Sequence, residues 1–136
     1  MQISLAQDAD VEPVVDLWRE VDLLRPWNDP HHDLELARQD PAAAVLVGRL
    51  EDVVVASVLV GFDGHRGWVY YLAVSPRLQG EGLGRRMMQA AQAWLTQAGA
   101  PKVQLMVRSS NDGVIGFYTG MGYERRDVVV LGRWLR

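Results

Sequence analysis

Residues 77–86 read RLQGEGLGRR and place three glycines, in positions 80–84, directly before an amphipathic stretch. Glycine loses more backbone entropy on folding than any other residue, so such a cluster requires a structural purpose. It also leaves backbone amides uncovered, and the first turn of a helix carries unpaired N–H groups and the positive end of the helix dipole. The stretch therefore predicts either a phosphate cradle, with Arg85 and Arg86 adding positive charge, or a simple tight turn.

The spacing of the glycines excludes two well-known phosphate loops. No lysine followed by serine or threonine comes after them, as a P-loop requires, and GEGLG does not have the GxGxxG spacing of a dinucleotide-binding fold. A phosphate bound here therefore belongs to a different kind of ligand.

The residues around this loop alternate between strand and helix patterns. After the loop, apolar residues recur at helical spacing from Leu83 to Ala98, and Gly99 with Pro101 predicts the end of that helix. Asp10 resembles an N-cap, and the apolar residues behind it predict a helix that ends before Pro26. Further helices are expected at 33–39 and 112–121, and strands at 2–6, 44–50, 53–62, 68–74, 103–107 and, as one or two strands, 124–135. This order predicts an α/β fold around a central mixed sheet.

Composition narrows the class of protein. A chain of 136 residues fits one domain, and 49% hydrophobic with 23% charged residues is ordinary for a globular protein. A formal net charge of −3 without a basic cluster argues against a nucleic-acid partner, and no segment reaches the ~20 apolar residues of a membrane helix. The absence of cysteine excludes disulfides and an acyl-cysteine intermediate. We expect a cytoplasmic protein that binds neither nucleic acid nor membranes.

Two stretches resemble the GNAT family of acetyltransferases. LAVSPRLQGEGLGRRMMQAA, residues 72–91, is similar to the family's Gln/Arg-x-x-Gly-x-Gly/Ala signature at Gln79, Gly82 and Gly84. NDGVIGFYTGMGYE, residues 111–124, is similar to its second signature. LLRPWNDP and FDGHRG further resemble a subgroup of small bacterial members. The resemblance covers essentially the whole chain.

The resemblance implies a single domain over residues 1–136, with a mixed, mostly antiparallel sheet, splayed strands and flanking helices. It implies acetyl-CoA as co-substrate, no metal, and direct transfer to a primary amine in a ternary complex. The residues that it assigns to the cofactor are Leu72, Ala73 and Val74 on the strand, Gln79, Gly80, Glu81, Gly82, Leu83, Gly84 and Arg85 in the loop, and Asn111 and Tyr118.

Acetyl transfer needs a neutral amine and a proton for the departing thiolate. Tyr118 stands at the family's position for the acid; the alternative is a packing residue on a short helix. The base is open, because the strand WVYYLAV contains no acid. Histidine is a common general base, but His65 lies roughly 26 Å along an extended strand from residue 73. Water ordered by Tyr70 or Tyr71 is the more economical base.

The acceptor is expected near the loop between the first two helices, which in this family lies over the acyl end of the cofactor. Arg25, Trp27, Asp29, Tyr70 and Tyr71 are the candidate acceptor-binding residues, although Asp29 also fits a simple turn. A metal site at His31–Asp33 lacks a further clustered ligand.

The sequence leaves two classes of function open. The first is an N-acetyltransferase acting on a small-molecule amine or on a protein or peptide amine. The second is a noncatalytic acyl-CoA-binding sensor or regulatory module. A homodimer is also left open.

Overall fold

The computed structural model describes residues 1–135, which fall into two compact units. The first unit is Met1–Met106 and the second begins at Val107. In the first unit the elements are β1 (Gln2–Leu5), the short η1 (Asp8–Asp10), α1 (Val11–Glu20), α2 (Pro30–Gln39), β2 (Ala43–Leu50), β3 (Val53–Phe62), β4 (Gly67–Val74), η2 (Pro76–Leu78), α3 (Leu83–Ala98) and β5 (Val103–Leu105). The second unit holds α4 (Asp112–Thr119).

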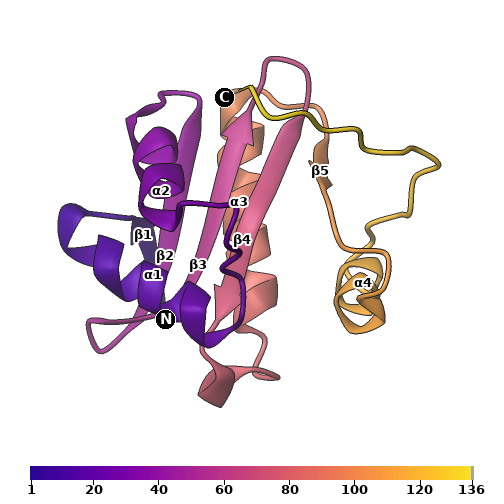
Figure 1. Cartoon of the computed structure of the whole chain (residues 1–136). Helices are drawn as coiled ribbons and strands as arrows, with labels where there is room; N and C mark the ends of the chain where they lie inside the picture. The colour runs from indigo at the N-terminus through magenta and orange to yellow at the C-terminus, as the bar shows by residue number, and fades with distance from the viewer. Residues whose placement is uncertain (136) are drawn as a thin grey trace. The chain divides into compact units, whose positions relative to one another are not determined.

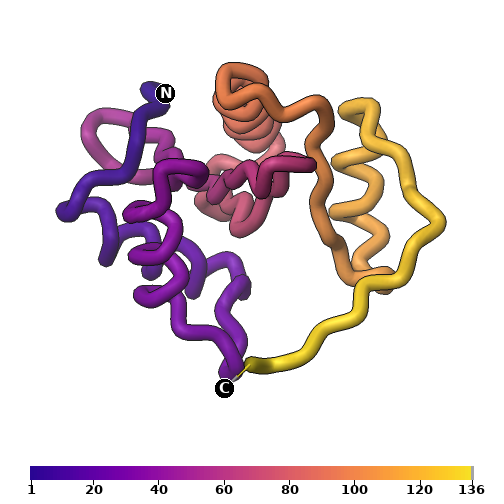
Figure 2. The backbone as a smooth tube through the Cα atoms, turned by 90° about the horizontal axis from the view of Figure 1, so that it is seen from above, coloured from indigo at the N-terminus to yellow at the C-terminus, as the bar shows by residue number. Residues whose placement is uncertain are grey.

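The sheet of the first unit has the order β1-β2-β3-β4-β5. Its first three pairings are antiparallel, and β5 pairs with β4 in parallel. α1 and α2 cover one face of the sheet and α3 covers the other (Figures 1 and 2). The predicted α/β class with a mixed, mostly antiparallel sheet and flanking helices is therefore confirmed.

The apolar faces predicted for the helices are the faces that they bury. α1 buries Val14, Val15, Leu17 and Trp18 against β2, β3 and β4. Pro13 lies in its first turn, where a missing N–H costs no helical hydrogen bond. On the other face of the sheet, α3 buries Met87, Met88, Ala91 and Leu95. At about 25 cal/mol per Å² of apolar surface, these two layers supply most of the driving force for folding.

β3 lies between the two helical layers, which explains its continuous apolar sequence. Side chains on a strand alternate between faces, so Ala56, Val58 and Val60 share one face, and all three are fully buried. Ser57 is also fully buried and lies on the opposite face, where Trp18 of α1 donates to it.

A bulge interrupts β4 at Tyr71. Ser57 pairs with Ala73 but Leu59 pairs with Tyr70, so three steps along β4 match two along β3. Tyr71 has a φ of 55°, a left-handed conformation that side chains other than glycine rarely adopt. β5 pairs with β4 only as far as Val69, and no strand of residues 1–106 pairs with the β5-side edge of β4 beyond that point. The parallel ladder thus ends before the bulge, at the last residue of β5, and the splay of the two strands stays a prediction.

The second unit corrects one prediction. Residues 124–135 were expected to form one or two strands, but no strand is present in the described part of that unit, and Val128–Leu131 are exposed. β-branched residues fit a half-buried pleated surface, but a strand also needs a neighbour that accepts and donates its backbone hydrogen bonds. α4 is the only regular element described in this unit, so it offers the segment no sheet edge.

Two glycines of the sheet give a matched test of the packing beneath α3. A Cβ built on Gly67 would lie 2.7 Å from both methyl carbons of the buried Leu95, whereas one on Gly61 would lie 3.6 Å from the nearest atom, in ordinary contact. We expect Gly67→Ala to lower the free energy of unfolding by about 1 to 3 kcal/mol, the usual cost of overpacking. Gly61→Ala should change it by less than about 0.5 kcal/mol in the same urea titration. Equal losses in the two variants would contradict this packing.

Candidate functional site

The glycine loop between η2 and α3 exposes backbone amides. Gly80 and Gly82 have φ values of 86° and 83°, and a Cβ added to either would meet no atom within 4 Å. Gly82 is the N-cap of α3, and no side chain caps it. The first N–H groups of α3 therefore have no side-chain cap and lie at the positive end of the helix dipole. This arrangement fits a phosphate group.

Some side chains around the loop form hydrogen bonds that hold it in place, and one charged side chain stays available. Gln79 Nε2 donates to the carbonyl of Val74 over 3.1 Å and so ties the loop to the end of β4. Arg86 donates to the carbonyl of Met1 over 2.9 Å, so its guanidinium is engaged with the N-terminal residue. Arg85 is exposed and forms no ion pair with the described residues. Of the two arginines, Arg85 is therefore the one available to an anion.

Three other elements hold the bulge of β4 at Tyr71. The Tyr71 ring stacks on Trp18 of α1, with 3.8 Å between centroids and 7° between planes. Trp18 Nε1 donates to Ser57 Oγ of β3 over 2.9 Å, and that hydroxyl donates to the carbonyl of Tyr71 over 3.3 Å. The Tyr71 hydroxyl donates to Asp33 of α2 over 2.7 Å. Both the backbone and the ring of Tyr71 are thus fixed in place.

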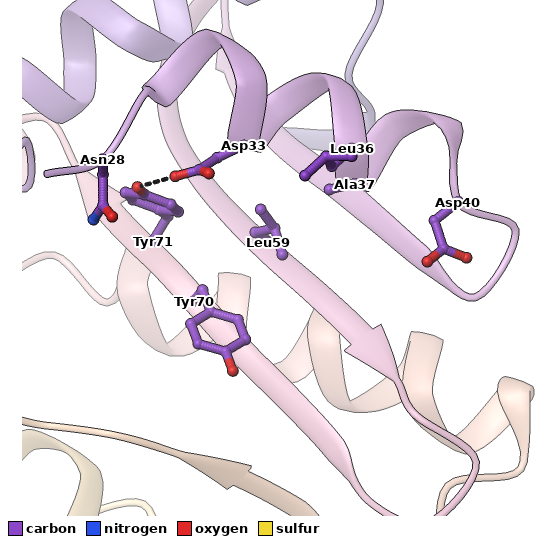
Figure 3. Close-up of a pocket in the computed structure, with 8 residues that line it drawn as sticks. All are labelled: Asn28, Asp33, Leu36, Ala37, Asp40, Leu59, Tyr70 and Tyr71. Carbon is purple, nitrogen blue, oxygen red and sulfur yellow. Dashed lines mark hydrogen bonds between the residues drawn. The ribbon is translucent and has the colours of Figure 1, made fainter. Parts of the chain in front are cut away.

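A cavity of about 510 Å³ opens beside this bulge, between α2 and the sheet (Figure 3). Its lining residues are Asn28, Asp33, Leu36, Ala37, Asp40, Leu59, Tyr70 and Tyr71. Burial, and then the Asp33 carboxylate, raise the pKa of Tyr71 well above its ordinary value. Burial, and then the charge of Asp63, raise the pKa of Tyr70. Both phenols are therefore neutral near pH 7 and act in the cavity as hydrogen-bonding groups, not as charged bases.

Some of the predicted acceptor-binding residues line the cavity, and others do not. Tyr70 and Tyr71 line it, together with Asn28 from the loop before α2. Asp29 instead caps α2, accepting from the amides of His31 and His32. Arg25 donates to the carbonyls of Asp22 and Leu24, at the end of α1, and Trp27 is about half exposed (52%). Arg25, Trp27 and Asp29 do not line the cavity.

Sequence reasoning missed the face that α2 turns toward the cavity. Asp33, Leu36, Ala37 and Asp40 are spaced by three, four and seven residues, so they share one side of a helix. That spacing is visible in the sequence. It gains meaning only once Leu59 and the two tyrosines are known to lie opposite it.

The second unit contains the other two predicted cofactor residues. Tyr118 of α4 is 8% exposed and packs edge-on against Phe117 and Tyr123, with ring centroids 5.0 and 5.6 Å away. Burial, with a smaller effect of Tyr123, raises the pKa of Tyr118 to about 12. Asn111 caps α4, its side-chain oxygen accepting from the amide of Val114 over 3.2 Å. Tyr118 is therefore a neutral phenol at physiological pH.

The histidines have local partners. His65 lies in an exposed turn where Asp63 accepts from the amides of His65 and Arg66, and these bonds lower the pKa of Asp63. His31 Nε2 lies 2.8 Å from Glu12. Over residues 1–135 there is no group of three or more histidine, aspartate or glutamate side chains placed to hold a metal ion. No helix in the same range is long and apolar enough to cross a membrane.

The sequence matches a known protein family and its members. The model of the acetyltransferase (GNAT) family matches residues 12–123. Acetyltransferase YE1169 of Yersinia enterocolitica is 42% identical over 135 residues, which cover 99% of this chain and 96% of that protein.

Solved structures share the fold at low sequence identity. The structure of AAC(6')-Iy in complex with the bisubstrate analogue CoA-S-monomethyl-acetylneamine has a TM-score of 0.84 at 16% identity, covering 98% of this chain and 97% of that one. The aminoglycoside acetyltransferase meta-AAC0020, from an uncultured soil metagenomic sample and in complex with sisomicin, has a TM-score of 0.81 at 18% identity, covering 99% and 96%.

Proposed function

The chain belongs to the GNAT family of acetyltransferases, and from that premise we propose that it moves the acetyl group of acetyl-CoA to a primary amine within one ternary complex. The family model runs from residue 12 to residue 123 and so crosses both compact units. This supports the further proposal that residues 1–136 act as one acetyltransferase domain.

The observation that carries the proposal is the glycine loop beside an unpaired strand edge. We assign the diphosphate of acetyl-CoA to the amides of Gln79–Arg85, because the space in front of Gly80 and Gly82 is open. The pantetheine arm carries amides, and no strand of residues 1–106 pairs with the β5 side of Leu72–Val74, beyond the bulge, although the Val74 carbonyl already accepts from Gln79. The neighbour AAC(6')-Iy, with its CoA-containing analogue, supports this choice of co-substrate.

We place the acceptor amine in the cavity beside Tyr70 and Tyr71, with Arg25, Trp27 and Asp29 proposed to act from the loop that leads to α2. The amine must lose a proton as its nitrogen bonds the acetyl carbon and the carbon–sulfur bond breaks. β4 carries no carboxylate, but Asp33 brings one from α2 to the Tyr71 hydroxyl. Water held by Tyr70 and Tyr71, with Asp33 behind it, is therefore the proposed route for that proton.

Tyr118 is the proposed acid, and Asn111 is the proposed contact of the second unit with the cofactor arm. A phenol with a pKa of about 12 keeps its proton at pH 7. A thiol is ordinarily the stronger acid, with a pKa of about 8.5, so Tyr118 is proposed to donate a hydrogen bond to the sulfur and to pass its proton only as the carbon–sulfur bond breaks and negative charge develops away from water. The sensor alternative assigns no role to this proton.

The loop can be tested with two glycines of matched conformation. Gly82 and Gly64 both have positive φ, at 83° and 88°, and both face open space. An alanine costs about 1 to 2 kcal/mol of backbone strain at either site. Only Gly82→Ala places a methyl group where the phosphate must approach, so we expect at least about tenfold weaker CoA binding, or 1.4 kcal/mol. Calorimetry should show unchanged affinity for Gly64→Ala. Equal affinity in the two variants would remove the loop from the site.

Turnover and the role of Tyr118 are tested in one assay, the release of CoA thiol from acetyl-CoA in the presence of an amine. Tyr118→Phe keeps the ring that packs on Phe117 and Tyr123, so CoA affinity should persist. A positioned acid contributes a factor of about 10² to 10⁴ to the rate, so kcat of Tyr118→Phe should be lower than that of the wild type by a factor in this range. For the wild type, kcat should rise with pH as the amine deprotonates. Deprotonation of Tyr118 should lower kcat only as the pH approaches about 12.

Two results would contradict these assignments. Full kcat in Tyr118→Phe, with the chemical step rate-limiting, would make the hydroxyl structural. CoA binding without thiol release across a panel of amines would favour the sensor.

A further inference from the structure

The cavity between α2 and the sheet is negatively charged at two separated points. Asp33 and Asp40 both line it, and its other lining residues are polar or apolar without charge. Neither carboxylate forms an ion pair with the described residues. Two uncompensated carboxylates in one cavity favour a cationic ligand.

The nearest basic side chain of α2 does not neutralise this charge. Arg38 is only 17% exposed and pairs with Asp8 over 2.6 Å and with Glu35 over 3.1 Å. Its guanidinium is therefore already committed to two carboxylates that do not line the cavity. Arg38 therefore leaves the charges of Asp33 and Asp40 in the cavity uncompensated.

The two carboxylates are separated by an apolar strip. Figure 3 shows Leu36 and Ala37 between Asp33 and Asp40 along α2, with Leu59 facing them from β3. Seven residues of helix rise about 10 Å. Leu36 is 57% exposed, so its side chain offers apolar surface along the cavity between the two carboxylates.

The ends of this strip differ. Asp33 accepts from the Tyr71 hydroxyl, next to the unpaired edge of β4, and a carboxylate bound once can still accept elsewhere. Asp40 is exposed, and one of its oxygens accepts from the amide of Ala42 over 2.8 Å. The reacting amine belongs at the Asp33 end, because that end adjoins the proposed cofactor edge. The Asp40 end is then left for a different group of the same acceptor.

We propose that the acceptor is a small diamine or polyamine, whose second, protonated amine binds Asp40 while its hydrocarbon section crosses Leu36, Ala37 and Leu59. The inference rests on the proposed acetyltransferase function and adds the substrate class. The amine that reacts must be neutral, whereas an ammonium ion beside a carboxylate is stabilised in its charged form. A second amine is therefore needed to use the charge at Asp40.

The test compares three acceptors with the same six-carbon chain: 1,6-diaminohexane, hexylamine and 6-amino-1-hexanol. We expect kcat/KM for the diamine to exceed that for the amino alcohol by about three- to tenfold. A factor of about two arises because the diamine has two equivalent amines, and an exposed charge contact contributes a further factor of about 1.4 to 5. The advantage should shrink as salt is added, because exposed charges are screened. Nα-acetyl-lysine methylamide, with its single amine, represents a protein lysine and should be used less well than the diamine.

Asp40→Asn removes the charge but keeps an oxygen for the Ala42 amide, so the turn should persist. In this variant the ratio of kcat/KM for the diamine to that for the amino alcohol should fall toward about two, the statistical value for two equivalent amines against one. Asp16→Asn is the matched control: Asp16 is an exposed aspartate of α1 paired with Arg19, away from the cavity, and its loss should preserve the ratio.

Three results would overturn the substrate class while leaving the acetyltransferase intact: a wild-type ratio of diamine to amino alcohol no greater than about two, an unchanged ratio in Asp40→Asn, or better use of the lysine derivative. If no amine supports thiol release, the proposed function fails instead. Calorimetry of 1,6-diaminohexane binding in the presence of CoA then still decides the inference. Binding weakened by Asp40→Asn and not by Asp16→Asn supports it, and equal binding contradicts it.

Discussion

The bulge at Tyr71 is the constraint on which the candidate site depends. A tyrosine at a φ of 55° is strained by about 1 to 2 kcal/mol relative to ordinary strand geometry. The ring stack on Trp18 and the hydrogen bonds to Ser57 and Asp33 offset that cost with groups from three other elements. Strain of this kind persists only where the surroundings over-determine the conformation, and such places are often functional.

The bulge separates two roles along one strand. Before it, β4 pairs with β5 and closes the sheet; beyond it, the backbone of Leu72–Val74 has no strand on that side within residues 1–106. At the bulge itself, Tyr70 and Tyr71 turn toward the cavity under α2. Next along the chain, Gln79 fixes the glycine loop to the end of β4. One local change of register thus brings a proposed acceptor cavity and a proposed cofactor edge onto neighbouring residues.

The sequence was informative where a pattern is local. Apolar periodicity predicted α1, α3 and the strands from β2 to β4, because the spacing of buried side chains follows directly from helix and strand geometry. The glycine loop was equally visible, since positive φ at Gly80 and Gly82 is what glycine is needed for. A bulge near Leu72–Val74 was implied only by the resemblance to the GNAT family, because a tyrosine carries no sequence sign of the left-handed backbone that Tyr71 adopts. The cavity was only half visible: its tyrosines were predicted, but Asp33 and Asp40 acquire their role from a strand distant in sequence. The expected strand at 124–135 was wrong, because β propensity does not supply a pairing partner.

The central claim is that the edge of β4 beyond Tyr71 and the glycine loop together receive the cofactor. A titration of the isotope-labelled protein with CoA, followed by the backbone amide resonances, tests it most directly. The account predicts that the largest changes fall on Leu72–Val74 and on Gly80–Arg86, and that they appear together at the same CoA concentrations. Changes confined to other parts of the chain, with both of these segments unaffected at saturating CoA, would contradict it.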